Sequence, residues 1–397
     1  MNEAVARVAN RLETVAAREA AIQAWAWIDS AHAMAQARAG TPGPLDGLPV
    51  GIKDIIDTAD MPTENGSPLC VGRRPTADAT LVQRLRAAGA VMLGKTVTTE
   101  FALAGELRTK NPHDPARTPG ASSAGSAAAV AAGMVPAAIG TQTVGSLLRP
   151  AAYCGVVGFK PTHGLIPLTG VARLSERDQA GVLATSIEQA SAVAAVMAGQ
   201  AYSEIADTRP PRLGFVRTAA WPEAQAETRL RVCRLAQDVE AREIVLPAEF
   251  DDALDVLTTI VYADVAEFLA PLQAEHGDRM SPLLRRSIEQ GRTIAPTVRA
   301  AARRRQHELA ERLDEILADF DGVLTPATPG EAPLATEGTG NPVFFALWTL
   351  CGVPALSLPL LRGPSSLPLG VQLVGAGHSD QRLLRAAHWL IAHGRSA

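Results

Sequence analysis

The sequence contains few cysteines and no cysteine motif. Its four cysteines, at positions 70, 154, 233 and 351, lie far apart, and none forms a CxxC or CxxxH pair. Cysteines that bind zinc or build a disulfide framework occur in close, regularly spaced groups. The sequence therefore predicts neither a zinc site nor a disulfide-stabilised fold.

The chain has a small net charge and lacks long apolar runs. The chain has 37 basic and 41 acidic residues, a formal net charge of −4, so no nucleic-acid or membrane partner is expected. No uncharged apolar run reaches the roughly 18 residues that a membrane-spanning helix needs. The N-terminal stretch carries charges throughout and lacks the apolar core of a signal peptide. We therefore expect a cytoplasmic protein.

Two turns of small residues dominate the middle of the chain. Residues 120–126 read GASSAGS, and residues 140–146 read GTQTVGS. Glycine and other small residues let backbone N–H groups crowd around a ligand, because they tolerate unusual backbone angles and leave room for close approach. Beside a serine, such N–H groups could form an oxyanion hole. The pattern indicates a nucleophilic serine site.

A lysine lies within an apolar stretch upstream of these turns. Lys53 has Val50, Ile52 and Ile55 as close neighbours in the chain. Taken alone, it could be an edge-strand lysine that reaches out to water. It could equally be a desolvated lysine whose lowered pKa lets it accept a proton at neutral pH. The residues by themselves leave both interpretations open.

These segments resemble the amidase signature family of serine hydrolases. Residues 120–162 are similar to its pattern GGSSGGS…GTDxGGSIRxPAxxCGxxGxKPT, and Ser146 follows Ser122 by the family's step of 24 residues. Residues 43–54 match the family's N-terminal pattern GPLxG[VI]P[VI]x[VI]KD at every position but Leu48. The resemblance extends from about residue 40 to 392 and is thinnest between 200 and 320.

The resemblance implies a Ser–cis-Ser–Lys relay. Ser146 would attack the carbonyl carbon and form an acyl-enzyme, and Lys53 would be the general base. Ser122, on a cis peptide, would pass protons between them. The backbone N–H groups of Thr143, Val144, Gly145 and Ser146 would form the oxyanion hole. Water would release the acid, with no metal and no organic cofactor.

The chain departs from the family pattern at several positions around the serines. Alanines stand for glycines at 121 and 124, Gln142 for an aspartate, and Val144 for a glycine of the second turn. A β-branched residue resists positive φ, so either the turn keeps a negative φ at Val144 or the oxyanion hole is distorted. Leu148 stands where the family has arginine, so together with Gln142 it suggests that an Asp–Arg interaction was lost as a unit. Because all three relay residues are present, an active enzyme is favoured over an inactive homologue.

A nucleotide-binding loop is a competing hypothesis. The eight residues from Gly89 to Thr96 read GAVMLGKT and satisfy the pattern GxxxxGK[ST]. That loop should follow a strand and stay open around a phosphate. Here the intervening residues 90–93 are apolar and predict a buried strand, and residues 79–88 before the first glycine predict a helix. The context therefore argues against nucleotide binding.

The remaining chain indicates one α/β domain. Apolar periodicity predicts helices over residues 2–37, 178–199, 223–240 and 379–392, and short apolar runs predict strands at 49–57, 213–216, 322–326, 355–359 and 369–375. The resemblance implies a mixed, twisted sheet covered on both faces by α-helices. The resemblance also implies that residues 1–397 form a single domain with four regions. These are N-terminal helices (1–39), the signature core (40–200), a variable helical substrate region (200–320), and C-terminal strands with a helix (321–397).

The expected function is hydrolysis of a C–N bond in a small amide, with carbamates, ureas and esters as related substrates. The eight histidines form no triad motif, and no GxSxG elbow is present. The alternative is a catalytically impaired homologue or a subunit of a transamidating complex. Family habit alone suggests a homodimer. Five large side chains are candidates for the pocket wall only because of their size, namely Trp221, Tyr262, Phe344, Phe345 and Trp348.

Overall fold

The computed structural model describes residues 3–103, 105, 107–205 and 209–394. The strands are β1 (Trp25–Ile28), β2 (Pro49–Lys53), β3 (Val91–Thr96), β4 (Ala137–Gln142), β5 (Val157–Lys160), β6 (Gln179–Ala184), β7 (Leu213–Val216), β8 (Arg242–Ile244), β9 (Gly322–Pro326), β10 (Ala355–Arg362) and β11 (Pro368–Val374). In the described part they form one 11-stranded sheet in the order β1-β3-β2-β4-β6-β5-β10-β11-β9-β7-β8. The sheet is mixed, because β3, β2 and β4 run parallel whereas β4, β6 and β5 alternate in direction.

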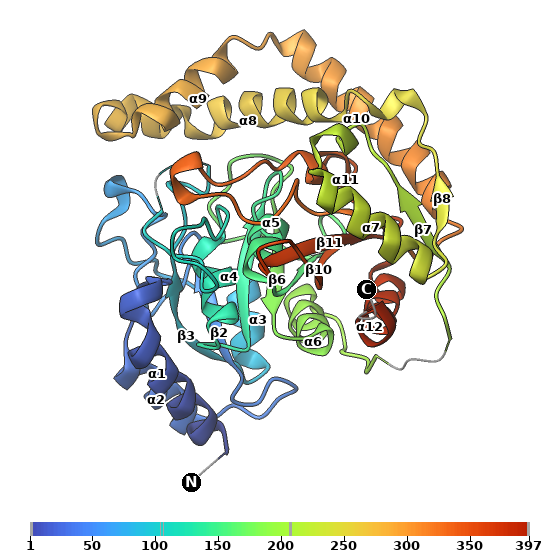
Figure 1. Ribbon diagram of the computed structural model, residues 1–397. Coiled ribbons are helices and arrows are strands. Elements are labelled where there is room, and N and C mark those ends of the chain that lie inside the picture. Colours follow the sequence, from blue (N-terminus) through green and yellow to red (C-terminus); the bar gives the residue numbers. More distant parts are fainter. Residues whose placement is uncertain (1–2, 104, 106, 206–208, 395–397) are drawn as a thin grey trace.

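Helices cover both faces of this sheet (Figure 1). The α-helices are α1 (Glu3–Ile22), α2 (Ser30–Ala39), α3 (Thr80–Ala87), α4 (Ala124–Ala131), α5 (Leu148–Cys154), α6 (Ile187–Ala198), α7 (Ala226–Asp238), α8 (Ala253–His276), α9 (Pro282–Arg292), α10 (Pro296–Leu317), α11 (Ala346–Leu350) and α12 (Asp380–His393). Short 3-10 helices occur at Pro68–Cys70, Trp221–Glu223, Ala248–Phe250, Gly277–Arg279, Ala335–Glu337 and Val343–Phe345. The predicted fold class is therefore confirmed.

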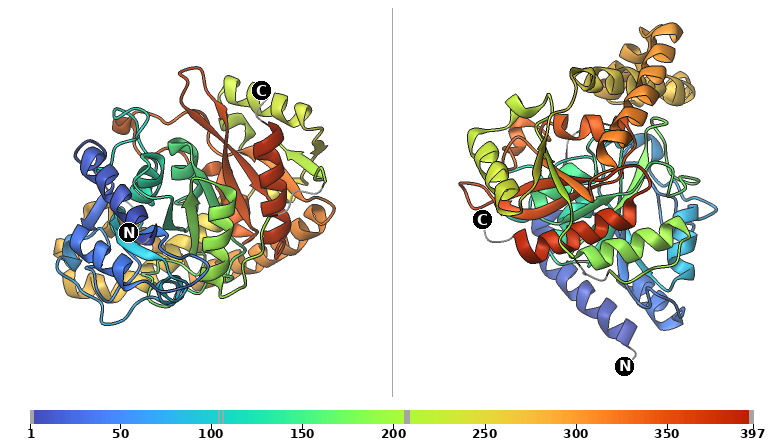
Figure 2. Two further views of the ribbon diagram at one scale, coloured as in Figure 1. Left: turned by 90° about the horizontal axis from the view of Figure 1, so that it is seen from below. Right: turned by 90° about the vertical axis from the view of Figure 1, so that its right-hand side faces the viewer.

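The layers follow from which elements touch. Helices α4 and α5 pack together against the central strands, whereas α6 packs against α3 and α12 and covers β6. Helices α8, α9 and α10 form a separate helical layer, seen at the top of Figure 1 and in the right-hand view of Figure 2, and α8 packs against α11. None of the helices in the described ranges is both long and apolar enough to cross a membrane.

Helix α4 lies unusually close to its neighbours because it is built from small residues. Its sequence is AGSAAAVA, and it is almost wholly buried. A Cβ on Gly125 would lie 2.3 Å from both the carbonyl oxygen of Ala24 and the backbone nitrogen of Val97, so only glycine fits there. This close packing brings the turn that precedes α4 against the end of β2.

Two predicted helical segments contain strands instead. The N-terminal segment is interrupted by β1, which pairs with β3. The helix predicted over residues 178–199 begins only at Ile187, because Gln179–Ala184 forms strand β6. Alanine and leucine favour helix locally, yet β6 is buried between β4 and β5, and pairing with both outweighs that preference.

Candidate active site

Two parallel strands carry the first candidate groups to one edge of the sheet. Strand β2 ends at Lys53, and its neighbour β4 ends at Gln142, with Ile52 opposite Ile139. The turn that holds the serine pair leads into α4, which packs on both strands. The carboxyl ends of parallel strands meet at one edge, which is where ligand sites of α/β sheets form.

Lys53 is fully buried and surrounded by hydroxyl groups. Its Nζ lies 2.7 Å from Ser122 Oγ, 3.0 Å from Ser123 Oγ and 2.7 Å from Thr141 Oγ1. Burial lowers the pKa of Lys53 to about 7, and the charge of Asp178 opposes this shift. No ion pair of Lys53 occurs among the described residues. Desolvation without a close carboxylate makes the neutral amine accessible near neutral pH.

The three hydroxyl groups around Lys53 have different hydrogen-bond roles. Ser123 Oγ donates to the carbonyl oxygen of Thr141 at 3.2 Å, so its proton is already used. The hydroxyl of Ser122 has only Lys53 as a partner among the described residues. A neutral amine donates two N–H bonds and accepts one through its lone pair. Ser122 can therefore donate its proton to Lys53.

The two serine turns lie against each other. The Ala121–Ser122 peptide bond is cis, as the resemblance implied. The N–H of Ser123 donates to the carbonyl oxygen of Ser146 at 3.0 Å. Ser122 is 1% exposed whereas Ser146 is partly exposed, so Ser146 is the serine that a solute could reach. The hydrogen bonds of the described residues link Lys53 to Ser122 but include none from Ser122 to Ser146.

Residues 143–146 form a turn that keeps its backbone donors free. Val144 is absent from the positive-φ residues of the described part, so the turn accommodates this β-branched residue at negative φ. In the described part, the N–H groups of Val144, Gly145 and Ser146 donate no hydrogen bond. A Cβ on Gly145 would lie 2.6 Å from the ring of Phe345, so the wall behind the turn requires glycine.

Gln142 takes over a structural role at the start of α5. Its Oε1 accepts hydrogen bonds from the N–H groups of Leu147 (3.1 Å) and Leu148 (3.0 Å). Its Nε2 donates to Thr349 Oγ1 at 3.0 Å, and Thr349 Oγ1 in turn donates to the carbonyl oxygen of Val144 at 2.7 Å. The amide therefore fixes the turn from behind, with both an acceptor and a donor.

Arg149, one position beyond the family's arginine, binds backbone instead of a carboxylate. It is 8% exposed, and its Nη2 donates to the carbonyl oxygen of Ala121 at 2.8 Å. Its Nη1 donates to the carbonyl oxygen of Gly340. Burial lowers its pKa to about 10. The side chain thus ties the serine-pair turn to the segment that precedes α11.

The GxxxxGK[ST] segment forms no phosphate loop. Strand β3 covers Val91–Thr96 and is buried at every position. Lys95 Nζ donates to the carbonyl oxygen of Ile56 (2.6 Å) and to Thr63 Oγ1 (2.6 Å), with Asp54 at 3.7 Å. A lysine whose ammonium is bound within the core has no donor to offer a phosphate, which agrees with the sequence argument.

The five large side chains that were candidates for the pocket wall because of their size lie in different parts of the structure. Phe344, Phe345 and Trp348 are buried, and Phe345 backs the 143–146 turn. Phe344 lines a separate cavity of about 380 Å³. Trp221 packs edge-on against Phe215, with its ring centroid 5.8 Å away. Tyr262 lies partly exposed on α8.

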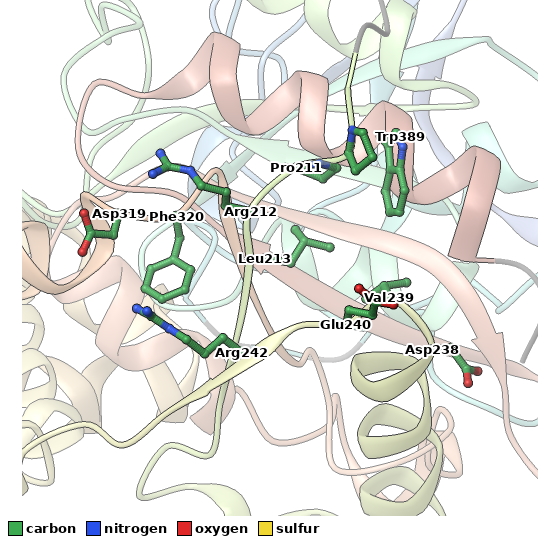
Figure 3. Close-up of a pocket in the computed structure, with 11 residues that line it drawn as sticks. Pro211, Arg212, Leu213, Asp238, Val239, Glu240, Arg242, Asp319, Phe320 and Trp389 are labelled. Atoms are coloured by element: carbon green, nitrogen blue, oxygen red, sulfur yellow. The ribbon is translucent and has the colours of Figure 1, made fainter.

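A cavity of about 650 Å³ lies away from these groups. Figure 3 shows its lining: Arg212 and Leu213 at β7, Arg242 on β8, Phe320, and Trp389 on α12. None of its lining residues belongs to the Lys53 cluster. Among the described residues no group of three or more His, Cys, Asp and Glu side chains could hold a metal ion.

Sequence reasoning missed three groups of this site. It assigned no role to Ser123 or Thr141, which contact Lys53, and none to Asp178, whose carboxylate accepts a hydrogen bond from Thr143 Oγ1 at 2.6 Å. Ser123 lies in the first small-residue turn and Thr141 in the second. Their hydroxyl groups were the only feature of the sequence that could have indicated a contact with Lys53. Asp178 was given no role, because it lies at the start of a segment that was predicted to be helical.

Comparisons with known proteins identify the family. The Amidase family model matches residues 3–384. The glutamyl-tRNA(Gln) amidotransferase A chain of Roseiflexus castenholzii (strain DSM 13941 / HLO8) is 34% identical, over 94% of this chain and 89% of its own. The chain therefore belongs to the amidase signature family of hydrolases.

Solved structures agree with this assignment. A crystal structure of an amidase superimposes with a TM-score of 0.90 at 31% identity, covering 98% of this chain and 96% of the other. A second, described as a vestigial protein complex that reveals the origins of an s-triazine catabolic enzyme, has a TM-score of 0.89 at 28% identity, covering 98% and 95%. The fold and the family thus support amide hydrolysis as the general activity.

Proposed function

We propose that the protein hydrolyses the C–N bond of a small amide through an acyl-enzyme on Ser146. One observation supports this most strongly. The buried amine of Lys53 lies 2.7 Å from the hydroxyl of Ser122, which is part of a turn hydrogen-bonded to Ser146. A neutral base, a hydroxyl relay and a reachable serine are what nucleophilic catalysis requires.

In the first half-reaction, Ser122 takes the proton of Ser146 and passes its own to Lys53. Ser146 Oγ forms a bond to the carbonyl carbon, and the carbonyl oxygen becomes an oxyanion. The N–H groups of Thr143, Val144, Gly145 and Ser146 are the proposed donors to it. Return of the proton to the leaving nitrogen breaks the C–N bond and leaves an ester on Ser146. In the second half-reaction water attacks that ester, and the relay returns its proton to Ser146.

Covalent labelling tests this proposal directly. A fluorophosphonate should react with the protein, and peptide mapping should place the adduct on Ser146. A panel of amides, carbamates, ureas and esters would then define the acyl pocket. Labelling of another serine, or equal labelling of a Ser146→Ala variant, would contradict the proposed nucleophile.

A second candidate function is that of one component of an amidotransferase complex. It is favoured by the 34% identity to the glutamyl-tRNA(Gln) amidotransferase A chain. Under this function, Ser146 would be labelled while the isolated chain showed little amide turnover. Full turnover by the purified chain alone would favour the independent hydrolase.

The pH dependence follows from the environment of Lys53. Burial lowers its pKa to about 7, and the relay needs the neutral amine. As the pH falls through this value the amine becomes protonated, so kcat/KM is expected to fall about tenfold per pH unit on the acid side. Initial rates between about pH 5 and pH 9 measure this profile, with fluorescence verifying that the protein stays folded. A rate independent of pH across that range would contradict a lysine base.

Gln142 offers a test of the turn. A Gln142→Leu variant loses the acceptor for the two N–H groups of α5 and the donor to Thr349. Because buried groups left without a partner cost about 1–3 kcal/mol each, we expect a lower Tm and a loss of kcat on the order of tenfold or more. Gln142→Glu keeps the acceptor and should lie between Gln142→Leu and wild type. Calorimetry and steady-state kinetics measure both effects, and a Gln142→Leu variant with unchanged Tm and kcat would show that Gln142 does not fix the turn.

A further inference from the structure

Asp178 lies where the catalytic turn meets strand β6. It immediately precedes β6, whose Gln179 pairs with Gln142 at the end of β4. Its side chain is buried, at 8% exposed. Oδ1 accepts the hydroxyl hydrogen bond of Thr143 at 2.6 Å. A buried carboxylate therefore holds the first residue of the turn that also carries Ser146.

The other oxygen of Asp178 organises its own loop. Oδ2 accepts hydrogen bonds from the N–H groups of Leu174 (2.6 Å) and Ser175 (3.1 Å). Burial raises the pKa of Asp178 above its ordinary value, whereas these hydrogen bonds and the charge of Arg173 oppose that rise. The loop of residues 174–178 thus wraps around the carboxylate.

A second buried carboxylate fastens the same loop to the helical layer. Asp264 on α8 accepts hydrogen bonds from Ser175 Oγ (2.7 Å) and the N–H of Glu176 (3.0 Å) through Oδ2. Its Oδ1 binds Arg299 (2.6 Å) and Arg303 (3.1 Å) of α10. The contacts of Asp264 therefore fasten the loop that carries Asp178 to α8 and α10.

Asp178 also acts on the candidate base. Thr141, two residues before Thr143, contacts Lys53 Nζ through its hydroxyl. In the described part, the hydrogen-bond partners of Lys53 Nζ are the uncharged hydroxyls of Ser122, Ser123 and Thr141. Lys53 ends β2 and Asp178 directly precedes β6, and both strands pair with β4, so the charge of Asp178 lies at the same edge of the sheet and opposes the lowering of the Lys53 pKa that burial causes. A negative charge nearby favours the ammonium form, and its removal favours the neutral amine.

We propose that Asp178 is a positioning residue with two effects, orienting the 143–146 turn through Thr143 and supplying the buried negative charge that acts on Lys53. This inference rests on the proposed function, because it assigns Asp178 to the same relay. The charge of Asp178 would then influence the pH at which Lys53 becomes neutral, and its hydrogen bond to Thr143 would orient the turn.

An Asp178→Asn variant separates charge from shape. The amide oxygen can accept the N–H groups of Leu174 and Ser175, and the NH2 group can donate to Thr143 Oγ1, because a hydroxyl also accepts. The negative charge is lost, together with the acceptor for the hydroxyl proton of Thr143. The pKa of Lys53 should fall, so the acid limb of the rate of fluorophosphonate labelling at Ser146 should move to lower pH by at least about half a unit.

Asp264→Asn is the matched control. It removes a buried carboxylate of α8 that binds the same loop but does not act on Lys53, so the Tm of this variant should fall while its acid limb stays at the wild-type pH. An Asp178→Asn limb that coincides with wild type would overturn the inference. A limb that moves equally in both variants would also overturn it, because general loosening of the loop would then explain the shift.

Thr143 supplies a test that does not depend on folding of the Asp178 variant. Thr143→Val removes the hydroxyl and should slow labelling about tenfold, without moving the acid limb, whereas Thr143→Ser should recover most of the rate. Equal labelling rates in the Thr143→Val and Thr143→Ser variants would overturn the positioning role. Absence of labelling in wild type at every pH would overturn the proposed function and this inference together. A labelled wild type with an unmoved limb in Asp178→Asn would overturn only the inference.

Discussion

Replacing Lys53 by methionine is expected to lower kcat/KM for the best amide substrate by on the order of a thousandfold or more. Methionine fills a similar volume without the amine, so no group would remain to take the proton that Ser122 relays. Because Lys53 pairs with hydroxyl groups and no carboxylate lies within ion-pair distance, its removal leaves no unpaired charge among the described residues. The variant should therefore fold, which calorimetry and circular dichroism would verify.

Lys160 provides the matched control for this prediction. It is also fully buried, burial lowers its pKa to about 7, and its Nζ lies 3.3 Å from Gln179 Oε1. It makes no contact with Ser122 or Ser146. Lys160→Met should lower stability by about 1–3 kcal/mol, since it leaves buried acceptors without a partner, and should keep most of the activity. Equal activity losses in both variants would argue that a buried lysine matters here only for folding.

Replacing Ser146 by alanine is expected to abolish covalent labelling and to reduce kcat by about ten-thousandfold. The oxygen that forms the acyl bond is lost, while the backbone donors of the turn are retained. Binding of substrate should therefore survive, so that KM or a measured Kd changes little. Burst-phase kinetics with an activated ester in wild type, and no burst in the variant, would report the acyl-enzyme.

Ser191 is the control for a change from serine to alanine. It is buried in α6, and its Oγ has no hydrogen-bond partner among the described residues. Ser191→Ala should leave kcat and Tm close to wild type. Amide turnover by Ser146→Ala at the wild-type rate would end the assignment of Ser146 as nucleophile, whatever the fold.

Parts of the fold were predictable because local signals and tertiary context agree there. The helix now seen as α3 and the strand now seen as β9 carry clean periodicity and clear end signals. Strands β1 and β6 were missed for the opposite reason. Strand β1 has only four residues, and the composition of β6 favours helix, so only pairing with neighbouring strands makes them extended.

The sequence by itself determined the family, the two small-residue turns, and the positions of Lys53, Ser122 and Ser146, because such motifs are read from adjacent residues. Tertiary structure decided how those groups meet. It showed that Ser123 and Thr141 complete the shell around Lys53, that Gln142 fixes the turn in place of an acid, and that Val144 fits at negative φ.

The physical reason is that these interactions join residues far apart in the chain. Lys53 and Thr141 meet only because β2 and β4 are parallel neighbours, and Asp178 meets Thr143 only because β6 returns beside β4. A pKa depends on burial and on such neighbours, so the chemical state of Lys53 is a property of the packed protein and not of the segment in which it was recognised.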